Sequence, residues 1–276
     1  MIDDADLLYR QHLTEADRRL LGRAAGADVP IEVALGDLRV EQAVLAGDDR
    51  GLADVSPFLT FAVAVHRTRA RLETVTYVAE PWAARQRIPV FDGGRLRELL
   101  ADPAVRFFLV ELLASYTHVS SGSTWQRTRR GWRRRRFSEL DPVRLAGLLE
   151  VVDPVERAGV FRRLGDLALF LAGVFPDHPL IGDLGGASID RLFRVSGLAP
   201  PGDDRPGGRQ LLELLGPRWY RAAAKSVRTH GVAQPVPATV AVVEKVAERF
   251  LDARRILNTV TDHYLFPLRQ RWFGVS

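Results

Sequence analysis

The chain has 276 residues, of which 46% are hydrophobic, so it can bury a sizeable core in one large domain or in two small ones. The absence of cysteine excludes a disulfide scaffold, a thiolate metal site, an iron–sulfur cluster and a cysteine nucleophile. The net charge of +5 favours anionic partners, although Lys225 and Lys245 are the only lysines among 39 basic residues, an arginine bias that GC-rich, bacterial-like codon usage also produces.

The first part of the sequence predicts helices that begin at recognisable capping residues. Thr14 can cap a helix over 14–25. Apolar residues recur with a helical period over 30–46, which predicts a second helix. Ser56, followed by proline, predicts the start of a core helix over 57–71.

The helical spacing of apolar residues is interrupted in the next part of the sequence and then resumes. Over 75–91, β-branched and aromatic residues surround two prolines, which favours an extended connector or a strand pair, with Val75–Val78 and Ile88–Phe91 as the only strand candidates. Helices are expected again over 95–100 and 103–118.

In the second half, Asp–Pro pairs act as start signals. They occur at 141–142 and 153–154, and predict helices that end near Val152 and Phe175. Helical periodicity predicts three further helices, over 188–195, 209–230 and 237–265.

These elements predict a mainly α fold, a multi-helix orthogonal bundle with a basic loop and at most a short β-ribbon. We expect an N-terminal helical region over 1–119, an arginine-rich loop over 120–137 and a C-terminal helical region over 138–276, or one compact domain overall. The longest nearly uncharged stretches fall well short of the about 20 apolar residues of a membrane-spanning helix, so the chain is not expected to span a membrane. The acidic N-terminus lacks the pattern of an export signal, which favours a cytoplasmic location.

The most unusual segment holds seven arginines in ten positions, interleaved with aromatic residues. The arginines are Arg127, Arg129, Arg130, Arg133, Arg134, Arg135 and Arg136, and the aromatic residues are Trp125, Trp132 and Phe137. Guanidinium groups neutralise phosphates and carboxylates while aromatic faces stack on bases, so an acidic protein surface, a nucleic acid or a phosphate-bearing ligand are all candidate partners. Because like charges repel, we expect these arginines to be largely solvent-accessible. The alternative is a solvated ribbon whose arginines pair with acidic side chains of neighbouring helices.

Two residues are weak catalytic candidates. His118 lies in a hydroxyl-rich stretch at a predicted helix end. Serines beside a histidine could form a nucleophile–base pair, but the stretch contains no known nucleophile motif. Such hydroxyl groups more often satisfy a helix end. Asp166 is the only charged residue between Leu164 and Phe175, so we expect it to be buried and bonded to an arginine or to other donors, in a structural role rather than a catalytic one.

No motif identifies a metal or cofactor. The sequence has neither a pair of histidines nor a glutamate and a histidine at metal-ligand spacing on a helix, and it has no Gly-rich phosphate-binding loop. Near the C-terminus, polar residues interrupt an apolar helix and predict either a polar seam between helices or a cleft with the Asp166 helix. They are Arg254, Arg255, Asn258, Asp262 and His263.

Three functions are consistent with these patterns. The first is a non-enzymatic binding or regulatory protein that presents the arginine and aromatic loop to an anionic partner. The second is a small-molecule enzyme with a helical pocket near His118 and Asp166. The third is a subunit of a larger protein assembly. The sequence carries no signal for the oligomeric state.

Overall fold

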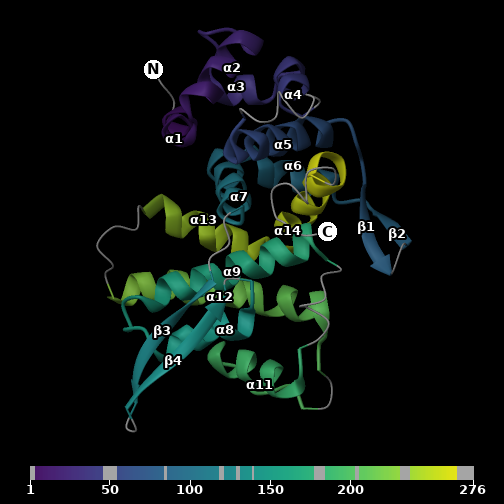
Figure 1. Ribbon diagram of the computed structural model, residues 1–276. Helices are drawn as coiled ribbons and strands as arrows, with labels where there is room; N and C mark the ends of the chain where they lie inside the picture. The colour runs from purple at the N-terminus through teal and green to yellow at the C-terminus, as the bar shows by residue number, and fades with distance from the viewer. Residues whose placement is uncertain are drawn as a thin grey trace. The chain divides into compact units, whose positions relative to one another are not determined.

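The fold is mainly α, as predicted, with two short antiparallel hairpins. The computed structural model describes residues 4–45, 55–83, 86–117, 121–128, 131–138, 140–176, 184–202, 205–230 and 237–265 (Figure 1). The chain forms two compact units. Unit 1 comprises Met1–Thr117 and Arg255–Ser276, and unit 2 comprises His118–Arg254.

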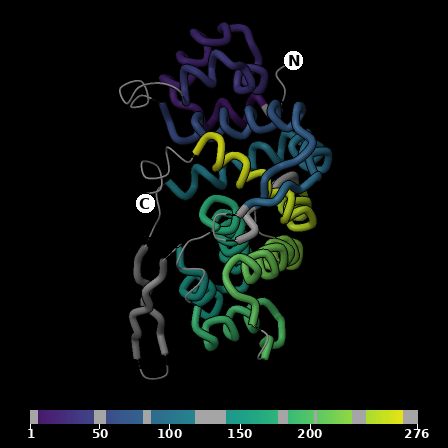
Figure 2. Tube along the Cα trace, turned by 90° about the vertical axis from the view of Figure 1, so that its right-hand side faces the viewer, coloured from purple at the N-terminus to yellow at the C-terminus, as the bar shows by residue number. Residues whose placement is uncertain are grey.

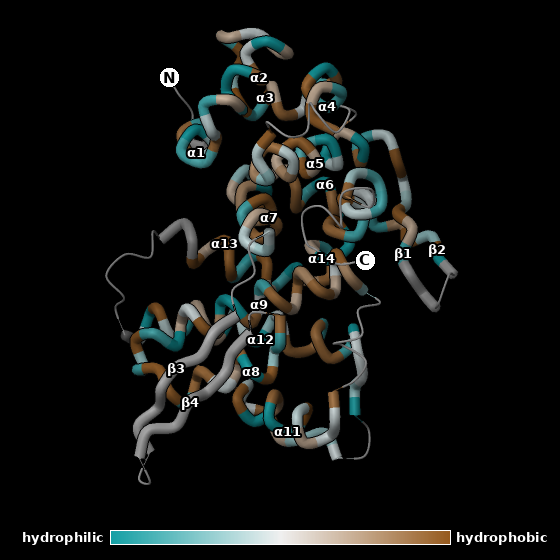
Figure 3. Tube along the Cα trace, in the orientation of Figure 1, coloured by the Kyte–Doolittle hydropathy of each residue, from teal (hydrophilic) through white to brown (hydrophobic). Residues whose placement is uncertain are grey.

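Unit 1 is built around one long buried helix. Its helices are α1 (Asp4–His12), α2 (Glu15–Ala25), α3 (Ile31–Leu35), α4 (Leu38–Leu45), α5 (Pro57–Leu72), α6 (Gly93–Ala101) and α7 (Pro103–Ser115). Helix α5 packs against α3, α4, α6 and α7, and its side chains Leu59, Phe61 and Val65 are fully buried. Figure 3 shows hydrophobic stretches along α5 and α7, as expected for helices that supply the core.

The predicted helix starts in unit 1 are confirmed by their capping bonds. The Thr14 side chain accepts a hydrogen bond from the Asp17 amide, and the Asp17 carboxylate accepts one from the Thr14 amide, which forms a capping box. Ser56 caps α5 and Asp102 caps α7, each followed by proline.

One prediction in unit 1 needs correction, and one helix was not predicted. The single helix expected over 30–46 is two helices, because the chain turns at Gly36, whose amide bonds to Val33 instead of continuing the helix. Helix α1 was not expected from the sequence.

The first hairpin belongs to unit 1. Strand β1 (Val78–Ala83) pairs with β2 (Gln86–Val90), and the register shifts between Pro81 and Ala83. The first strand thus begins where the predicted strand ends. The irregular register lies next to Pro81, which cannot donate to the ladder.

Unit 2 is organised around a close pair of helices. Its helices are α8 (Pro142–Ala146) with a 3₁₀ turn at Gly147–Glu150, α9 (Arg157–Val174), α11 (Gly186–Val195), α12 (Gly208–His230) and α13 (Pro237–Glu248). Helices α9 and α12 pack along their lengths. A Cβ atom at Gly165 of α9 would lie 2.5 Å from the Tyr220 ring of α12, so glycine permits this approach.

The two Asp–Pro start signals of unit 2 have different outcomes. Asp141 caps α8 as predicted, because its carboxylate accepts from the amides of Val143 and Arg144. The prediction that Asp153 starts a long helix is wrong by several residues. The Glu156 amide bonds to the Asp153 carbonyl three residues back, which closes a turn, and α9 begins only at Arg157.

The long C-terminal helix expected over 237–265 is divided into three parts. Helix α13 ends at Glu248, α14 spans Phe250–Val260, and a π-helical turn spans Thr261–Leu265. The assignment to units changes within α14, between Arg254 and Arg255. Figures 1 and 2 show the end of α14 and the π-helical turn beside helices of unit 1.

Candidate functional site

The arginine-rich segment is the second β-hairpin. Strand β3 (Ser121–Thr128) pairs antiparallel with β4 (Gly131–Ser138), and β4 lies beside α8 in unit 2 (Figure 1). The composition here was consistent with a loop or ribbon, but strands were predicted only at the first hairpin, and that prediction was wrong. Period-two signals are weak in this segment because arginine occupies both faces of β4.

The register of the hairpin sorts the candidate residues into two sets. Trp125 pairs with Arg134, Arg127 with Trp132, and Ser123 with Arg136. Because directly paired positions share a face and successive positions alternate, both tryptophan positions and three arginine positions fall on one face of the ribbon. We call these five positions the Trp/Arg face.

The remaining four arginines of the segment do not belong to the Trp/Arg face as the structure describes it. Arg133 pairs with Gln126 and Arg135 with Thr124, which puts both on the opposite face. Arg129 and Arg130 lie outside the described residues. The side chains of 118–139 are also outside the described part of the structure, so the prediction of solvent accessibility is untested.

His118 lies outside the described residues too. Two hydroxyl groups just before it bond to backbone carbonyls at the end of α7. Ser115 Oγ donates to the Leu112 carbonyl at 2.8 Å, and Thr117 Oγ1 donates to the Ala114 carbonyl at 2.8 Å. These two hydroxyl groups satisfy a helix end, the alternative weighed against catalysis.

Asp166 is buried and bonded to an arginine, as predicted, and its carboxylate also accepts a second hydrogen bond, from a tyrosine. Its side chain lies on α9, where Arg162 Nε is 2.9 Å from Asp166 Oδ1 and the Tyr220 hydroxyl donates to the same oxygen at 2.9 Å. Tyr220 crosses Gly165, one residue away. Helix packing therefore accounts for these contacts, and they give Asp166 a structural role in joining α9 to α12.

The polar residues of the C-terminal helix form ion pairs within each unit. In unit 2, Arg254 is fully buried and its Nε lies 3.0 Å from Glu213 Oε1. In unit 1, Arg255 Nε donates to Glu80 at 2.9 Å, and Arg255 Nη1 also contacts Asp92. Arg254 thus joins two helices, α14 and α12, as the polar-seam interpretation expects, whereas Arg255 pairs with strand β1 and with the residue before α6.

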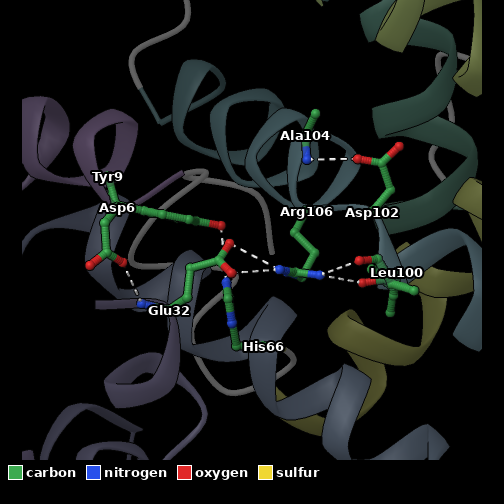
Figure 4. A network of polar contacts seen from close by, with 9 residues as sticks. Asp6, Tyr9, Glu32, His66, Leu100, Asp102, Ala104 and Arg106 are labelled. Atoms are coloured by element: carbon green, nitrogen blue, oxygen red, sulfur yellow. Dashed lines mark hydrogen bonds and ion pairs between the residues drawn. The ribbon is translucent and has the colours of Figure 1, made fainter. Parts of the chain in front are cut away.

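Unit 1 also holds a buried polar network that sequence patterns did not indicate (Figure 4). Arg106 is 2% exposed and donates to both carboxylate oxygens of Glu32, at 2.9 and 2.8 Å, and to the Leu100 carbonyl at 2.7 Å. The Tyr9 hydroxyl lies 3.0 Å from His66 Nε2. The network joins α1, α3, α5 and α7 through four residues that are far apart in sequence, so no local spacing could reveal it.

Burial shifts the pKa values of two members of this network, Tyr9 and His66. Desolvation, followed by the positive charges of Arg106 and Arg69, lowers the pKa of His66 to about 3. Burial and the Glu32 carboxylate raise the pKa of Tyr9 far above its usual value. The phenol therefore keeps its proton near neutral pH, and the neutral imidazole can accept a hydrogen bond from it at Nε2.

Comparison with protein families, with curated proteins and with solved structures finds no match for this chain. Within the described ranges, no group of three or more histidine, aspartate or glutamate side chains is placed to hold a metal ion. No helix in the part of the chain that the structure describes is long and apolar enough to cross a membrane.

Proposed function

We propose that the protein is a non-enzymatic binding protein that holds an anionic partner, a single-stranded nucleic acid, on the Trp/Arg face of the β3–β4 hairpin. The observation that supports this proposal is the cross-strand register, which pairs Trp125 with Arg134 and Trp132 with Arg127. Each tryptophan position therefore has an arginine position directly opposite on the same face.

The alternation of aromatic and cationic positions favours nucleic acid over the other anionic partners. An acidic protein surface would satisfy the arginines but would give the two tryptophans no matching contact. A single strand offers both kinds of contact, because its phosphates pair with guanidinium groups and its unpaired bases stack on indole rings. Stacking contributes about 1–3 kcal/mol per base and tolerates any sequence.

Binding of a labelled oligothymidylate, followed by fluorescence anisotropy across a salt series, tests the proposal. The triple variant Arg127→Ser, Arg134→Ser, Arg136→Ser should weaken binding and reduce the slope of log affinity against log salt by about 2, since each lost phosphate contact contributes about 0.7. The double variant Trp125→Ala, Trp132→Ala should weaken binding and leave the slope unchanged.

The double variant Arg133→Ser, Arg135→Ser is the matched control, because it removes arginines of the opposite face. It should change the affinity less per arginine than the Trp/Arg-face variant. Equal losses in both arginine variants would refute the assignment of binding to one face. Failure of the intact protein to bind the single strand, with binding of an acidic peptide instead, would refute the choice of nucleic acid.

A further inference from the structure

Unit 1 contains a cleft that shares no residue with the β3–β4 hairpin. It has a volume of about 400 Å³, within the roughly 300–1,000 Å³ typical of small-molecule sites. Its lining comes from the last turn of α5, the segment 74–77 with the start of β1, strand β2, the end of α14 and the π-helical turn. Short π-helical segments are rare and are found often at functional sites.

The charged residues of the cleft leave one positive charge uncompensated. Arg87 of β2 and Asp262 of the π-helical turn neutralise each other, since Arg87 Nη2 donates to Asp262 Oδ1 at 2.8 Å and Nη1 contacts the other oxygen. Arg71 also lines the cleft and has no acidic partner among the residues that the structure describes. A guanidinium group in this position is available to a ligand.

The polar residues near Arg71 add hydrogen-bonding groups without adding charge. Thr74, Thr76 and His263 all belong to the lining. The Thr74 hydroxyl donates to the Arg71 carbonyl at 2.9 Å, so the Thr76 hydroxyl and the His263 imidazole are the groups that can donate to a ligand. Partial burial and the positive charge of Arg71 lower the pKa of His263, while Asp262 opposes the shift and Arg87 adds to it. The ring is therefore neutral at pH 7 and can either donate or accept.

The rest of the lining is apolar and includes an aromatic ring. Leu72, Val75 and Val78 form part of it. Tyr77 lines the cleft with 52% of its surface exposed, and its ring lies 5.9 Å from that of Phe91, which is 75% exposed. Two large aromatic side chains exposed together at the edge of a cleft offer a flat surface to a planar ligand.

We propose that this cleft binds a small organic anion that carries one carboxylate or phosphate group on a planar apolar body. Arg71 pairs with the oxyanion, the neighbouring hydroxyl and imidazole groups complete its hydrogen bonds, and Tyr77 packs against the planar part. The site is independent of the proposed nucleic acid binding, since it lies in unit 1 and shares no residue with the hairpin.

Titration calorimetry with benzoate, phenyl phosphate and inorganic phosphate tests the site. Arg71→Gln should weaken binding of the preferred aromatic anion about tenfold or more, the loss expected for one hydrogen-bonded ion pair. Arg69→Gln is the matched control, because Arg69 lies in the same last turn of α5, has no acidic partner in the described part of the chain and does not line the cleft. It should leave the affinity unchanged.

Two further readouts separate a bound ligand from a change in folding. A bound anion should raise the pKa of His263, followed by its imidazole proton resonances, since it adds negative charge beside the ring. Thermal unfolding of Arg71→Gln without ligand should match that of the parent protein. Absence of saturable binding by all three anions at millimolar concentration, or equal binding by Arg71→Gln and the parent, would overturn the proposal. The hairpin triple variant should bind the anion normally, so either proposal can fail alone.

Discussion

At the scale of single residues, the buried His66, which bonds to Tyr9, makes the stability of the fold depend on pH. His66 is 4% exposed, and its pKa falls from 6.5 in an unfolded chain to about 3 in the fold. Below pH 6.5 the unfolded chain therefore binds a proton that the folded protein does not. The stability associated with His66 is fully present above pH 6.5 and is lost as the pH falls toward 3.

We expect the free energy of unfolding to fall by about 2 kcal/mol between pH 7 and pH 5 because of this histidine alone. His66→Gln should remove that part of the pH dependence, as measured by urea unfolding at both pH values. Tyr9→Phe is the control, since it deletes the hydrogen bond but keeps the titrating ring. It should lower stability at both pH values and preserve the difference. Parallel pH profiles for His66→Gln and the parent protein would contradict the assignment.

At the scale of elements, Gly165 permits the close packing of α9 on α12. The Cβ atom of an alanine at 165 would lie 2.5 Å from Tyr220 Cδ1, so either the ring or the helix must move. Movement of Tyr220 would also disturb its hydrogen bond to Asp166. The close approach of the two helices and the satisfaction of a buried carboxylate are thus linked through one ring.

Gly165→Ala should destabilise the protein by about 1–3 kcal/mol, the usual effect of overpacking. Gly159→Ala is the matched control on the same helix, because a Cβ atom there meets nothing within 4 Å. It should stabilise the protein by up to about 1 kcal/mol through helix propensity. Thermal unfolding of both variants measures the difference, and a neutral or stabilising Gly165→Ala would contradict the packing described.

The elements that the sequence predicted well are those with local start signals. Thr14, Ser56, Asp102 and Asp141 form caps through hydrogen bonds to amides two or three residues away, so a short window of sequence contains the whole interaction. Features that depend on distant contacts were missed. The pairing of Arg106 with Glu32 joins residues 74 positions apart, whose proximity only the fold determines. The β3–β4 hairpin pairs neighbouring segments and was missed for another reason, because arginine occupies both faces of β4.

The candidate site was predictable in composition and not in geometry. The sequence identified the arginines and tryptophans, but only the register assigns Arg127, Arg134 and Arg136 to one face and Arg133 and Arg135 to the other. Of the residues that line the cleft beside the π-helical turn, the sequence indicated only Asp262 and His263, as polar residues that interrupt an apolar helix. Arg87, the partner of Asp262, lies on β2, and no spacing rule connects two residues so far apart in sequence.

At the scale of the whole molecule, the last part of the chain supplies each unit with an arginine that forms an ion pair inside that unit. Arg255 pairs with Glu80 and Asp92 in unit 1, whereas Arg249 Nε donates to Asp252 at 2.6 Å in unit 2. Arg255→Gln should remove the hydrogen bonds from Arg255 to Glu80 and Asp92 and lower the stability of unit 1 by about 1.5–3 kcal/mol, the range for hydrogen bonds to charged groups.

Hydrogen exchange followed by mass spectrometry can localise this effect. Arg255→Gln should reduce protection in the peptides of β1, β2 and α6, and leave those of α9 and α12 as they are. Arg249→Gln should give the opposite pattern, since Asp252 is 1% exposed and belongs to unit 2. Uniform loss of protection across the chain in both variants would show that the two units unfold together.

The division of unit 1 between the two ends of the chain has a consequence for its synthesis. A ribosome releases residues 118–254 before Arg255, so all the residues of unit 2 emerge while unit 1 is still incomplete. At typical translation rates this interval lasts on the order of 10 s. Throughout it, Glu80 and Asp92 carry negative charge without the arginine that neutralises them. Unit 1 can therefore complete its ion pairs with Arg255 only after every residue of unit 2 has been made.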